Sequence, residues 1–176
     1  MAVARALGDV DLVSIDSMQV YRGMDIGTAK PSPEERAEIT HHLLDLVDPS
    51  HEFTVAEFRV AYSAAIEAVG ALDRRALLVG GTGLYHRVVI DDFDLPGQWP
   101  DVRAELETEH DTVELHRRLG ELDPSAAAKM DPRNRRRVVR EIEVTIGSGR
   151  PFCSFGLGVD DYPACDVVQI GLGWPR

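Results

Sequence analysis

The chain has 176 residues, of which 44% are hydrophobic and 28% are charged, and its formal net charge is -11 at pH 7. This length and apolar content predict a globular fold with a real core and argue against intrinsic disorder. The negative charge excludes a general nucleic-acid coat, because affinity for phosphate backbones comes from clustered Lys and Arg. Only two cysteines, Cys153 and Cys165, and no apolar run long enough to cross a bilayer predict a cytoplasmic protein without membrane association.

The first half of the chain predicts alternating helices and strands. Capping boxes at Ser32 and Thr54 mark two helix starts. The segment 76–79 is apolar throughout, which is typical of a parallel strand covered on both faces. This alternation predicts an α/β fold built on a doubly wound parallel sheet. The expected ranges are 1–7 (helix), 12–15 (strand), 32–39 (helix), 41–49 (strand), 54–72 (helix), 76–79 (strand) and 84–90 (helix).

The second half of the chain predicts short helices instead. Residues 91–100 carry the Pro, Gly and Asp residues of a connection between domains. An apolar strand returns only at 166–172, so we expect an α/β core of residues 1–95 plus 165–176 that is interrupted by a helical insertion of residues 96–164. The helices expected in the insertion are 100–110, 112–122, 124–130 and 134–146, the last one ending at Gly147.

A polar stretch, residues 16–30, begins where the first strand stops. Asp16 falls at the carboxyl end of this strand, where open α/β sheets place their ligands. A short carboxylate there is suited to accept a proton from an amine or hydroxyl nucleophile. A polar loop in which Asp16 only caps a helix accounts for the same composition.

A glycine-rich turn, Gly80-Gly81-Thr82-Gly83, follows the third strand. Backbone amides in such a turn can approach an anion closely and the Thr82 hydroxyl can donate to it, which suits a diphosphate. Alternatively, the glycines only permit a tight turn from strand to helix. The pattern G-x-x-x-x-G-K-[ST], which a sheet of this kind normally carries after its first strand, does not occur in the chain.

One dense basic patch stands out in this acidic chain. Several of its arginines share a helix face through three- and four-residue spacing, which makes the patch a candidate for phosphate contacts. A solvated face paired with Glu141 and Glu143 is the simpler interpretation, and the two can hold together. The arginines are Arg133, Arg135, Arg136, Arg137 and Arg140.

Taken together, these segments resemble one family, the tRNA dimethylallyltransferases (tRNA isopentenyltransferases). The resemblance covers nearly the whole chain, and the first segment with its order relative to the others is highly specific. The matching segments are DSMQVYRGMDIGTAKP at 16–31, HHLLDLVDP at 41–49, LLVGGTGLY at 77–85, VRAELE at 102–107, DPSAAAKMDPRNRRRVVREIEV at 123–144 and SGRPF at 148–152.

The resemblance implies transfer of the dimethylallyl group of dimethylallyl diphosphate to the N6 amine of the adenosine 3′ of the tRNA anticodon. It also implies a P-loop nucleotide-kinase-like core, Mg²⁺ as cofactor and a helical insertion that grips the anticodon stem-loop. By this similarity Asp16 would deprotonate the amine of a flipped base, and Thr82 would bind the leaving diphosphate. The other implied site residues are Ser17, Met18 and Gln19 at the base, Gly80 and Gly81 at the diphosphate, and Arg103, Arg136, Arg137 and Arg140 on the tRNA.

The sequence also departs from the family pattern. The family's Walker-type loop is missing, so we expect an internal piece that lacks the first strand and the C-terminal region and is inactive or weak by itself. A nucleotide kinase, an adenylate prenyltransferase and a non-catalytic RNA-binding remnant remain alternatives on the same scaffold. We expect a monomer. His41 and His42 lack the further ligands of a metal site, so no metal ligand is predicted.

Overall fold

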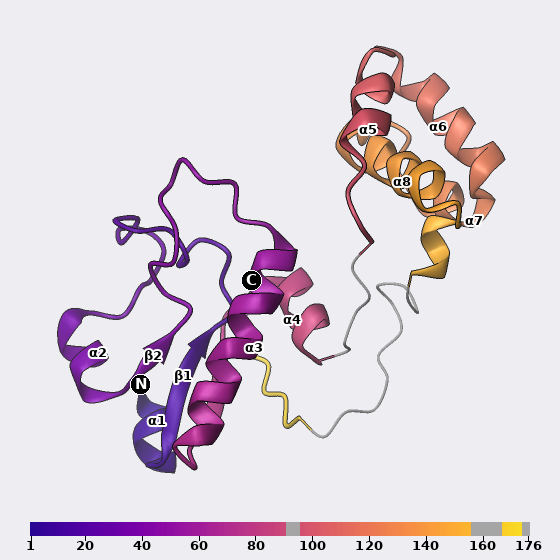
Figure 1. The fold of residues 1–176 in the computed structure, drawn as a ribbon. Helices are drawn as coiled ribbons and strands as arrows, with labels where there is room; N and C mark the ends of the chain where they lie inside the picture. Colours follow the sequence, from indigo (N-terminus) through magenta and orange to yellow (C-terminus); the bar gives the residue numbers. More distant parts are fainter. Residues whose placement is uncertain (91–95, 156–166, 174–176) are drawn as a thin grey trace. The chain divides into compact units, whose positions relative to one another are not determined.

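The structure is a computed structural model that describes residues 1–90, 96–155 and 167–173. The chain divides into two compact units, Met1–Asp92 and Phe93–Arg176, which we call the α/β unit and the helical unit. Figure 1 shows strands only in the first of them. The expected α/β fold with a parallel sheet is confirmed, and the extent of core and insertion stays a prediction.

The α/β unit contains a small parallel sheet of three strands, β1 (Val10–Ser14), β2 (His41–His42) and β3 (Arg75–Val79), in the order β2-β1-β3. All five residues of the central strand β1 are buried. The expectation that β3 is covered on both faces is wrong, because its side chains are half-buried or exposed. In the described part of the chain β3 pairs only with β1 and forms an edge of the sheet.

The second strand is much shorter than the predicted range 41–49. Leu43 and Asp45 have φ angles of 63° and 54°, in the left-handed region that a β-strand cannot use. Beyond them, pairing resumes only as a single parallel bridge between Tyr21 and Val47. The segment therefore bends back against the polar stretch instead of extending the sheet.

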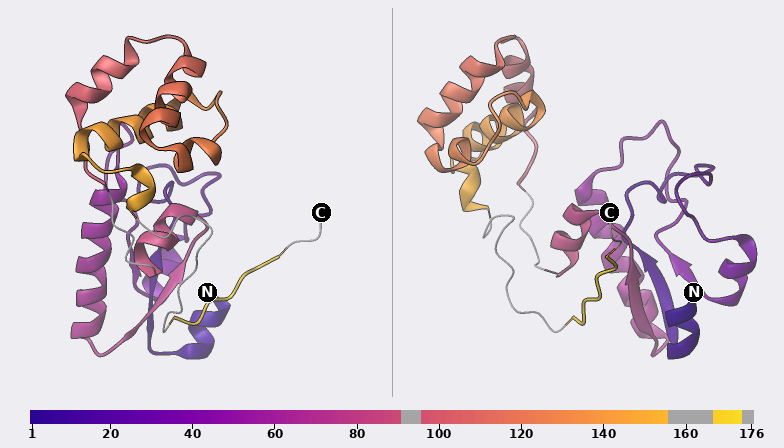
Figure 2. Two further views of the ribbon diagram at one scale, coloured as in Figure 1. Left: turned by 90° about the vertical axis from the view of Figure 1, so that its right-hand side faces the viewer. Right: turned by 180° about the vertical axis from the view of Figure 1, so that it is seen from behind.

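The helices of the α/β unit agree with the predicted ones. In the capping box of the longest, the Thr54 hydroxyl accepts from the Glu57 amide at 3.2 Å and the Glu57 carboxylate accepts from the Thr54 amide at 2.7 Å. This helix runs along the sheet (Figures 1 and 2) and buries Phe58, whereas Leu72, the last residue of the predicted range, caps its end and is 68% exposed. The helices are α1 (Ala2–Leu7), α2 (Pro33–Glu38), α3 (Val55–Ala71) and α4 (Gly83–Ile90).

The helical unit contains the four predicted helices and one short element that was not predicted. Leucines and valines that recur at helical spacing form its core, with Leu119, Val138 and Ile142 fully buried. The elements are α5 (Pro100–Glu107), α6 (Thr112–Leu122), α7 (Pro124–Ala128), α8 (Arg135–Ser148) and the 3-10 helix η1 (Phe152–Ser154).

The prediction that α8 ends at Gly147 is wrong. The helix continues to Ser148 and ends at Gly149, whose φ of 69° provides the left-handed cap. Gly147 has a packing role instead: a Cβ atom built on it would lie 2.2 Å from the indole ring of Trp99. A glycine at this point lets the segment before α5 lie directly on α8.

The strand predicted at 166–172 is also wrong where it can be checked, since residues 167–173 form no strand and are exposed. Residue 166, residues 91–95 of the predicted connection, and Cys165 lie outside the described residues. Cys153 is a free, exposed thiol. Within the described ranges, no helix combines the length and the apolar character that a membrane span requires.

Replacing Gly147 with alanine should destabilise the helical unit by about 1–3 kcal/mol, because the new methyl group would overlap the Trp99 ring. Urea unfolding followed by circular dichroism, with hydrogen exchange of α8 amides as the local readout, measures the effect. Gly120→Ala is the matched control: its Cβ would lie 3.9 Å from Ala127, an ordinary contact, so its stability should change by no more than about 1 kcal/mol. Equal stability of both variants would contradict the packing role.

Candidate functional site

The parallel strands β1 and β3 bring the polar stretch and the glycine turn to the same end of the sheet. Their register pairs Ser14 with Val79, the last residues of the two strands, so the segments that follow both strands begin at the same edge of the sheet. The Ser17 amide donates to the Thr82 hydroxyl oxygen at 2.9 Å, and the two hydroxyl groups lie 3.2 Å apart. Two segments that are 65 residues apart in sequence thus meet in one site.

The glycine turn packs closely on the end of β1. A Cβ atom built on Gly80 would lie 2.5 Å from the carbonyl carbon and oxygen of Ile15, so only glycine fits there. The Thr82 amide donates to the same Ile15 oxygen at 3.3 Å. Gly81 has nothing within 4 Å of its Cβ position. The tight-turn interpretation therefore has a physical basis at Gly80, whereas Gly81 faces open space.

Asp16 keeps part of its carboxylate available. Its Oδ1 atom accepts from the Met18 amide at 2.8 Å, and within the described ranges the other oxygen has no hydrogen-bond partner. Burial, the nearby Tyr21 and the Asp16 charge raise the pKa of Tyr85 to about 12, so that phenol stays protonated at neutral pH. The Tyr85 ring is fixed by stacking on Phe58, with ring centroids 3.7 Å apart.

Gln19 and Met18, both predicted to line the base, lie in different surroundings. The Gln19 side-chain oxygen accepts from the Ser14 hydroxyl at 2.8 Å, and its nitrogen donates to the Thr28 carbonyl at 2.9 Å. The oxygen end of the Gln19 amide therefore ties the polar stretch to β1, and the nitrogen end ties the stretch to itself at Thr28. Met18 is 45% exposed, and because its amide binds the Asp16 carboxylate, it places a solvent-accessible apolar side chain near Asp16.

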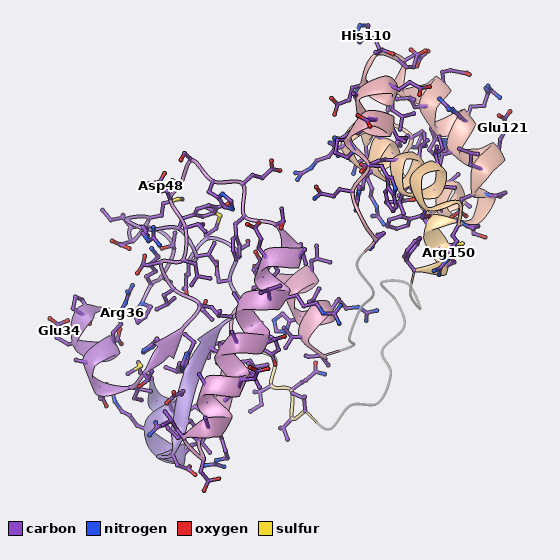
Figure 3. All side chains as sticks on the ribbon, viewed as in Figure 1. Glu34, Arg36, Asp48, His110, Glu121 and Arg150 are labelled. Carbon is purple, nitrogen blue, oxygen red and sulfur yellow. The ribbon has the colours of Figure 1, made fainter. Side chains whose placement is uncertain are left out.

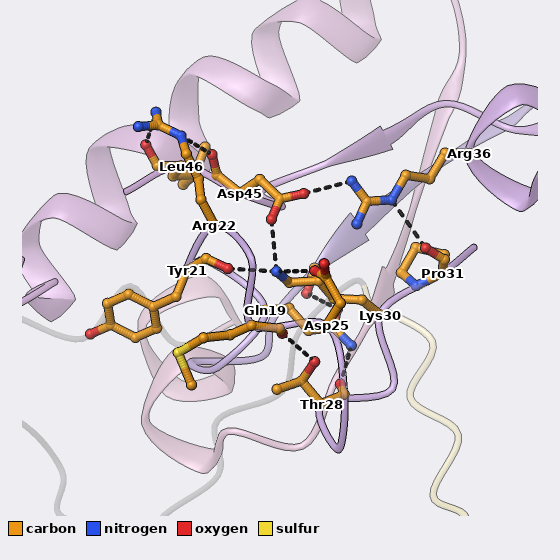
Figure 4. Close-up of polar contacts among 12 residues, drawn as sticks. Gln19, Tyr21, Arg22, Asp25, Thr28, Lys30, Pro31, Arg36, Asp45 and Leu46 are labelled. Atoms are coloured by element: carbon orange, nitrogen blue, oxygen red, sulfur yellow. Dashed lines mark hydrogen bonds and ion pairs between the residues drawn. The ribbon is translucent and has the colours of Figure 1, made fainter. Parts of the chain in front are cut away.

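A buried lysine closes the polar stretch on itself (Figure 4). The Lys30 side chain is only 1% exposed, and its ammonium group donates to the Tyr21 carbonyl at 2.5 Å, to Asp25 at 2.9 Å and to Asp45 at 2.7 Å. Arg36 binds the other Asp45 oxygen at 2.6 Å. We call these five residues the Lys30 clamp. Because a buried ammonium is costly unless its protons are donated, the clamp holds the stretch in one conformation.

The sequence pattern predicts no role for Lys30, since a lone lysine next to proline normally lies on the surface. His41 and His42 bind the Ile39 carbonyl at 2.7 Å and the Asp11 carboxylate at 2.8 Å. In the described ranges no three His, Cys, Asp or Glu side chains are grouped to hold a metal ion. These residues alone do not form the Mg²⁺ site that the resemblance implies.

In the helical unit, two of the predicted tRNA-binding arginines meet on one buried carboxylate. The Glu143 side chain is 2% exposed, and it accepts from Arg140 at 2.8 Å, from the Trp99 amide at 2.9 Å and from Arg103 at 3.4 Å. Arg140 also donates to the carbonyls of Pro96 and Gly97, each at 2.9 Å. Arg103 and Arg140 therefore hold the start of α5 on α8, whatever else they contact.

The other two predicted arginines, Arg136 and Arg137, are more exposed to solvent than Arg140. Arg137 is about half-exposed and pairs with Glu141 at 3.2 Å. Arg136 is exposed and has no partner within the described residues. The pairing with Glu141 and Glu143 that the sequence suggested is confirmed, but the expected solvated face is wrong at these two carboxylates, because both are buried. Arg137 is thus paired and half-exposed, and Arg136 has no partner within the described residues.

Comparison with known proteins places these features in a family. Residues 19–176 match the family model described as IPP transferase. The chain belongs to the IPP transferase family. It spans about half the length of the curated relatives it matches.

Among these IPP transferase relatives, the chain is 46% identical over 184 residues to the tRNA dimethylallyltransferase of Bifidobacterium adolescentis, covering 100% of this chain and 54% of that protein. It is 47% identical over 169 residues to the tRNA dimethylallyltransferase of Kineococcus radiotolerans, and the match covers 94% of this chain and 53% of that protein.

Two solved structures of the family resemble this one. The full-length tRNA isopentenylpyrophosphate transferase of Bacillus halodurans is 43% identical, with a TM-score of 0.51 over 86% of this chain and 51% of that one. A eukaryotic dimethylallyltransferase described as acting on tRNA is 27% identical, with a TM-score of 0.69, and the match covers 84% of this chain and 38% of that one. The match to the eukaryotic protein extends the likeness in fold beyond close sequence relatives.

The Lys30 clamp predicts a large difference between the two lysines of the chain. Acetic anhydride should modify exposed Lys129 readily and leave Lys30 unmodified, because the Lys30 ammonium is buried and fully donated. Mass spectrometry of tryptic peptides measures both sites in one sample. In Asp45→Asn, labelling of Lys30 should rise at least about tenfold as the clamp opens, with Lys129 as the internal control. Equal labelling of both lysines in the parent chain would contradict the clamp.

Acid should open the same clamp. Partial burial raises the pKa of Asp45, but hydrogen bonds from Lys30 and Arg36 outweigh it and hold this pKa below the ordinary 3.8. A folded pKa below the unfolded one adds stability that is complete from about pH 5 upward and is lost as the pH falls through the folded value. Hydrogen exchange of the Asp45 and Val47 amides should show full protection near neutral pH and loss below 3.8. Asp45→Asn should lack this transition.

Proposed function

We propose that the chain carries the acceptor-binding and part of the diphosphate-binding machinery of a tRNA dimethylallyltransferase. Its substrates would be dimethylallyl diphosphate and the adenosine 3′ of the anticodon in tRNA. The observation that supports this most is the hydrogen bond between Ser17 and Thr82, which holds Asp16 next to the open glycine turn. The names of the relatives point to the same reaction.

In the proposed reaction, the N6 nitrogen of adenine attacks C1 of the dimethylallyl group. The bond between C1 and the diphosphate oxygen breaks, and the diphosphate leaves with that electron pair. The free oxygen of Asp16 takes the proton that the amine loses. The target base must leave its stack for this geometry, and exposed Met18 offers an apolar surface for it.

The leaving diphosphate would be bound by the turn after β3. The Thr82 hydroxyl, which lies against Ser17 in the free protein, can rotate to donate to a diphosphate oxygen, and the open backbone at Gly81 lets the anion come close. We propose Mg²⁺ as the accompanying ion, which would neutralise the diphosphate charge. Within the described ranges no three His, Cys, Asp or Glu side chains are grouped to hold this ion.

The helical unit would contact the anticodon stem-loop. Arg136 and Arg137 are less enclosed by internal contacts than Arg103 and Arg140. Arg103 would contribute the donors that Glu107 and Glu143 do not use, and Arg140 those that Glu143 and the carbonyls of Pro96 and Gly97 do not use. We further propose a cytoplasmic monomer in which the insertion 96–164 interrupts, along the chain, an α/β core of residues 1–95 plus 165–176. The 176-residue chain itself would transfer weakly or not at all, because it contains no G-x-x-x-x-G-K-[ST] loop to hold the diphosphate.

The test is a transfer assay with unmodified tRNA and labelled dimethylallyl diphosphate. It compares the chain as given with one extended at its N-terminal end by the corresponding segment of the Bacillus halodurans relative. The extended chain should be active, and in it Asp16→Asn and Thr82→Ala should each lower the rate about 100-fold or more. Circular dichroism should show that both variants fold.

Asp73→Asn is the matched control for Asp16→Asn. It removes the same charge from an exposed residue whose φ of 54° asparagine tolerates, so the rate should not change. Parental rates in Asp16→Asn and Thr82→Ala would overturn the assigned roles. Faster transfer to AMP or ADP than to tRNA would favour an adenylate prenyltransferase, and tRNA binding without turnover would favour a non-catalytic RNA-binding protein.

A further inference from the structure

A hollow of about 500 Å³ lies in the helical unit where the end of α5 meets the start of α8. Its wall carries three guanidinium groups, one imidazole and one carboxylate, in a chain whose net charge is -11. Local positive charge on this acidic protein therefore gathers in a concave surface. The lining residues are Arg103, Glu107, His110, Arg135, Arg136 and Val139.

Arg135 is the fixed member of this wall. Its Nη2 atom donates to the carbonyls of Glu107 at 3.3 Å and Glu109 at 2.6 Å, which anchors the guanidinium at the end of α5. Its Nη1 atom is buried and has no hydrogen-bond partner. A buried charged donor without a partner is unfavourable, so an acceptor that entered the hollow would satisfy this atom.

The other groups leave the positive charge of the hollow uncompensated. The single carboxylate, Glu107, is already paired with Arg103 at 2.9 Å. Arg136 and His110 have no partner in the described part of the chain, and the His110 side chain projects from the turn after α5 (Figure 3). Two guanidinium groups, those of Arg135 and Arg136, therefore face the hollow without a balancing carboxylate.

We propose that this hollow binds the phosphate backbone of RNA, with Arg135 and His110 as contacts in addition to Arg103 and Arg136. The inference rests on the proposed function and adds two residues to its RNA-binding surface. Guanidinium groups bind phosphate oxygens through two parallel hydrogen bonds, which suits fixed Arg135. The guanidinium groups of the wall come from both α5 and α8, so the linked phosphates of RNA can contact several of them at once.

The test measures binding of a labelled anticodon stem-loop RNA to the 176-residue chain over a series of salt concentrations. Arg135→Gln and Arg136→Gln should each lower the slope of log K against log salt by about 0.7–0.9, the effect of one lost phosphate contact. His110→Gln should weaken binding about threefold. Arg117→Gln is the control: it removes the same charge from an exposed arginine on α6 that pairs with Glu114 and Glu121 outside the hollow, and its slope should not change.

Thermal unfolding followed by circular dichroism controls for folding, because Arg135 also anchors two carbonyls. Arg136→Gln removes no contact with another described residue, so this variant should stay folded and tests the hollow even if Arg135→Gln unfolds. RNA binding by the parent with slopes in both variants equal to that of Arg117→Gln would overturn this inference and leave the proposed function standing. Displacement of the RNA by inorganic diphosphate from the parent but not from Arg136→Gln would assign the hollow to a free anion instead. A parent chain that bound no RNA would overturn both proposals.

Discussion

The parallel pairing of β1 with β3 is the constraint on which the candidate site depends. Because of this pairing, the polar stretch and the glycine turn begin at the same edge of the sheet, and the hydrogen bond between Ser17 and Thr82 then joins them. Gly80 permits this approach because any side chain there would collide with the Ile15 backbone. The carboxylate and the glycine turn that we propose as base and anion-binding turn thus share one end of the sheet, the position where open α/β folds bind ligands.

Buried charges organise both units by the same physics. An ion that is removed from water must find several partners, so it draws chain segments together. Lys30 binds Tyr21, Asp25 and Asp45 and so fixes the polar stretch. Glu143 on α8 binds the Trp99 amide before α5, Arg103 on α5 and Arg140 on α8. As a consequence, the arginines proposed for RNA binding differ in how far internal contacts occupy them. Arg103 and Arg140 bind Glu143 and hold the start of α5 on α8, and Arg103 also lines the hollow, where uncompensated charge remains at Arg135 and Arg136.

Local signals in the sequence predicted much of this structure. The capping boxes at Ser32 and Thr54 and the apolar spacing of α5 to α8 depend on residues within a few positions of each other, so they could be read directly. The early end of β2 could not be predicted, because Leu43 and Asp45 adopt left-handed angles while Lys30 and Arg36 hold the Asp45 carboxylate. The partners of Gly147 and Lys30 lie elsewhere in the chain, and no local pattern reveals them.

The sequence by itself determined the α/β class, the family, and Asp16 and Thr82 as the candidate pair, because each depends on residue types and their order along the chain. The tertiary structure decided which predicted groups are free to act. It tied Gln19, Arg103 and Arg140 into internal contacts, and it left an Asp16 oxygen and Arg136 available. It also revealed Arg135 and His110 as lining one hollow. Availability depends on which distant groups compete for each donor and acceptor, and only folding brings those groups together.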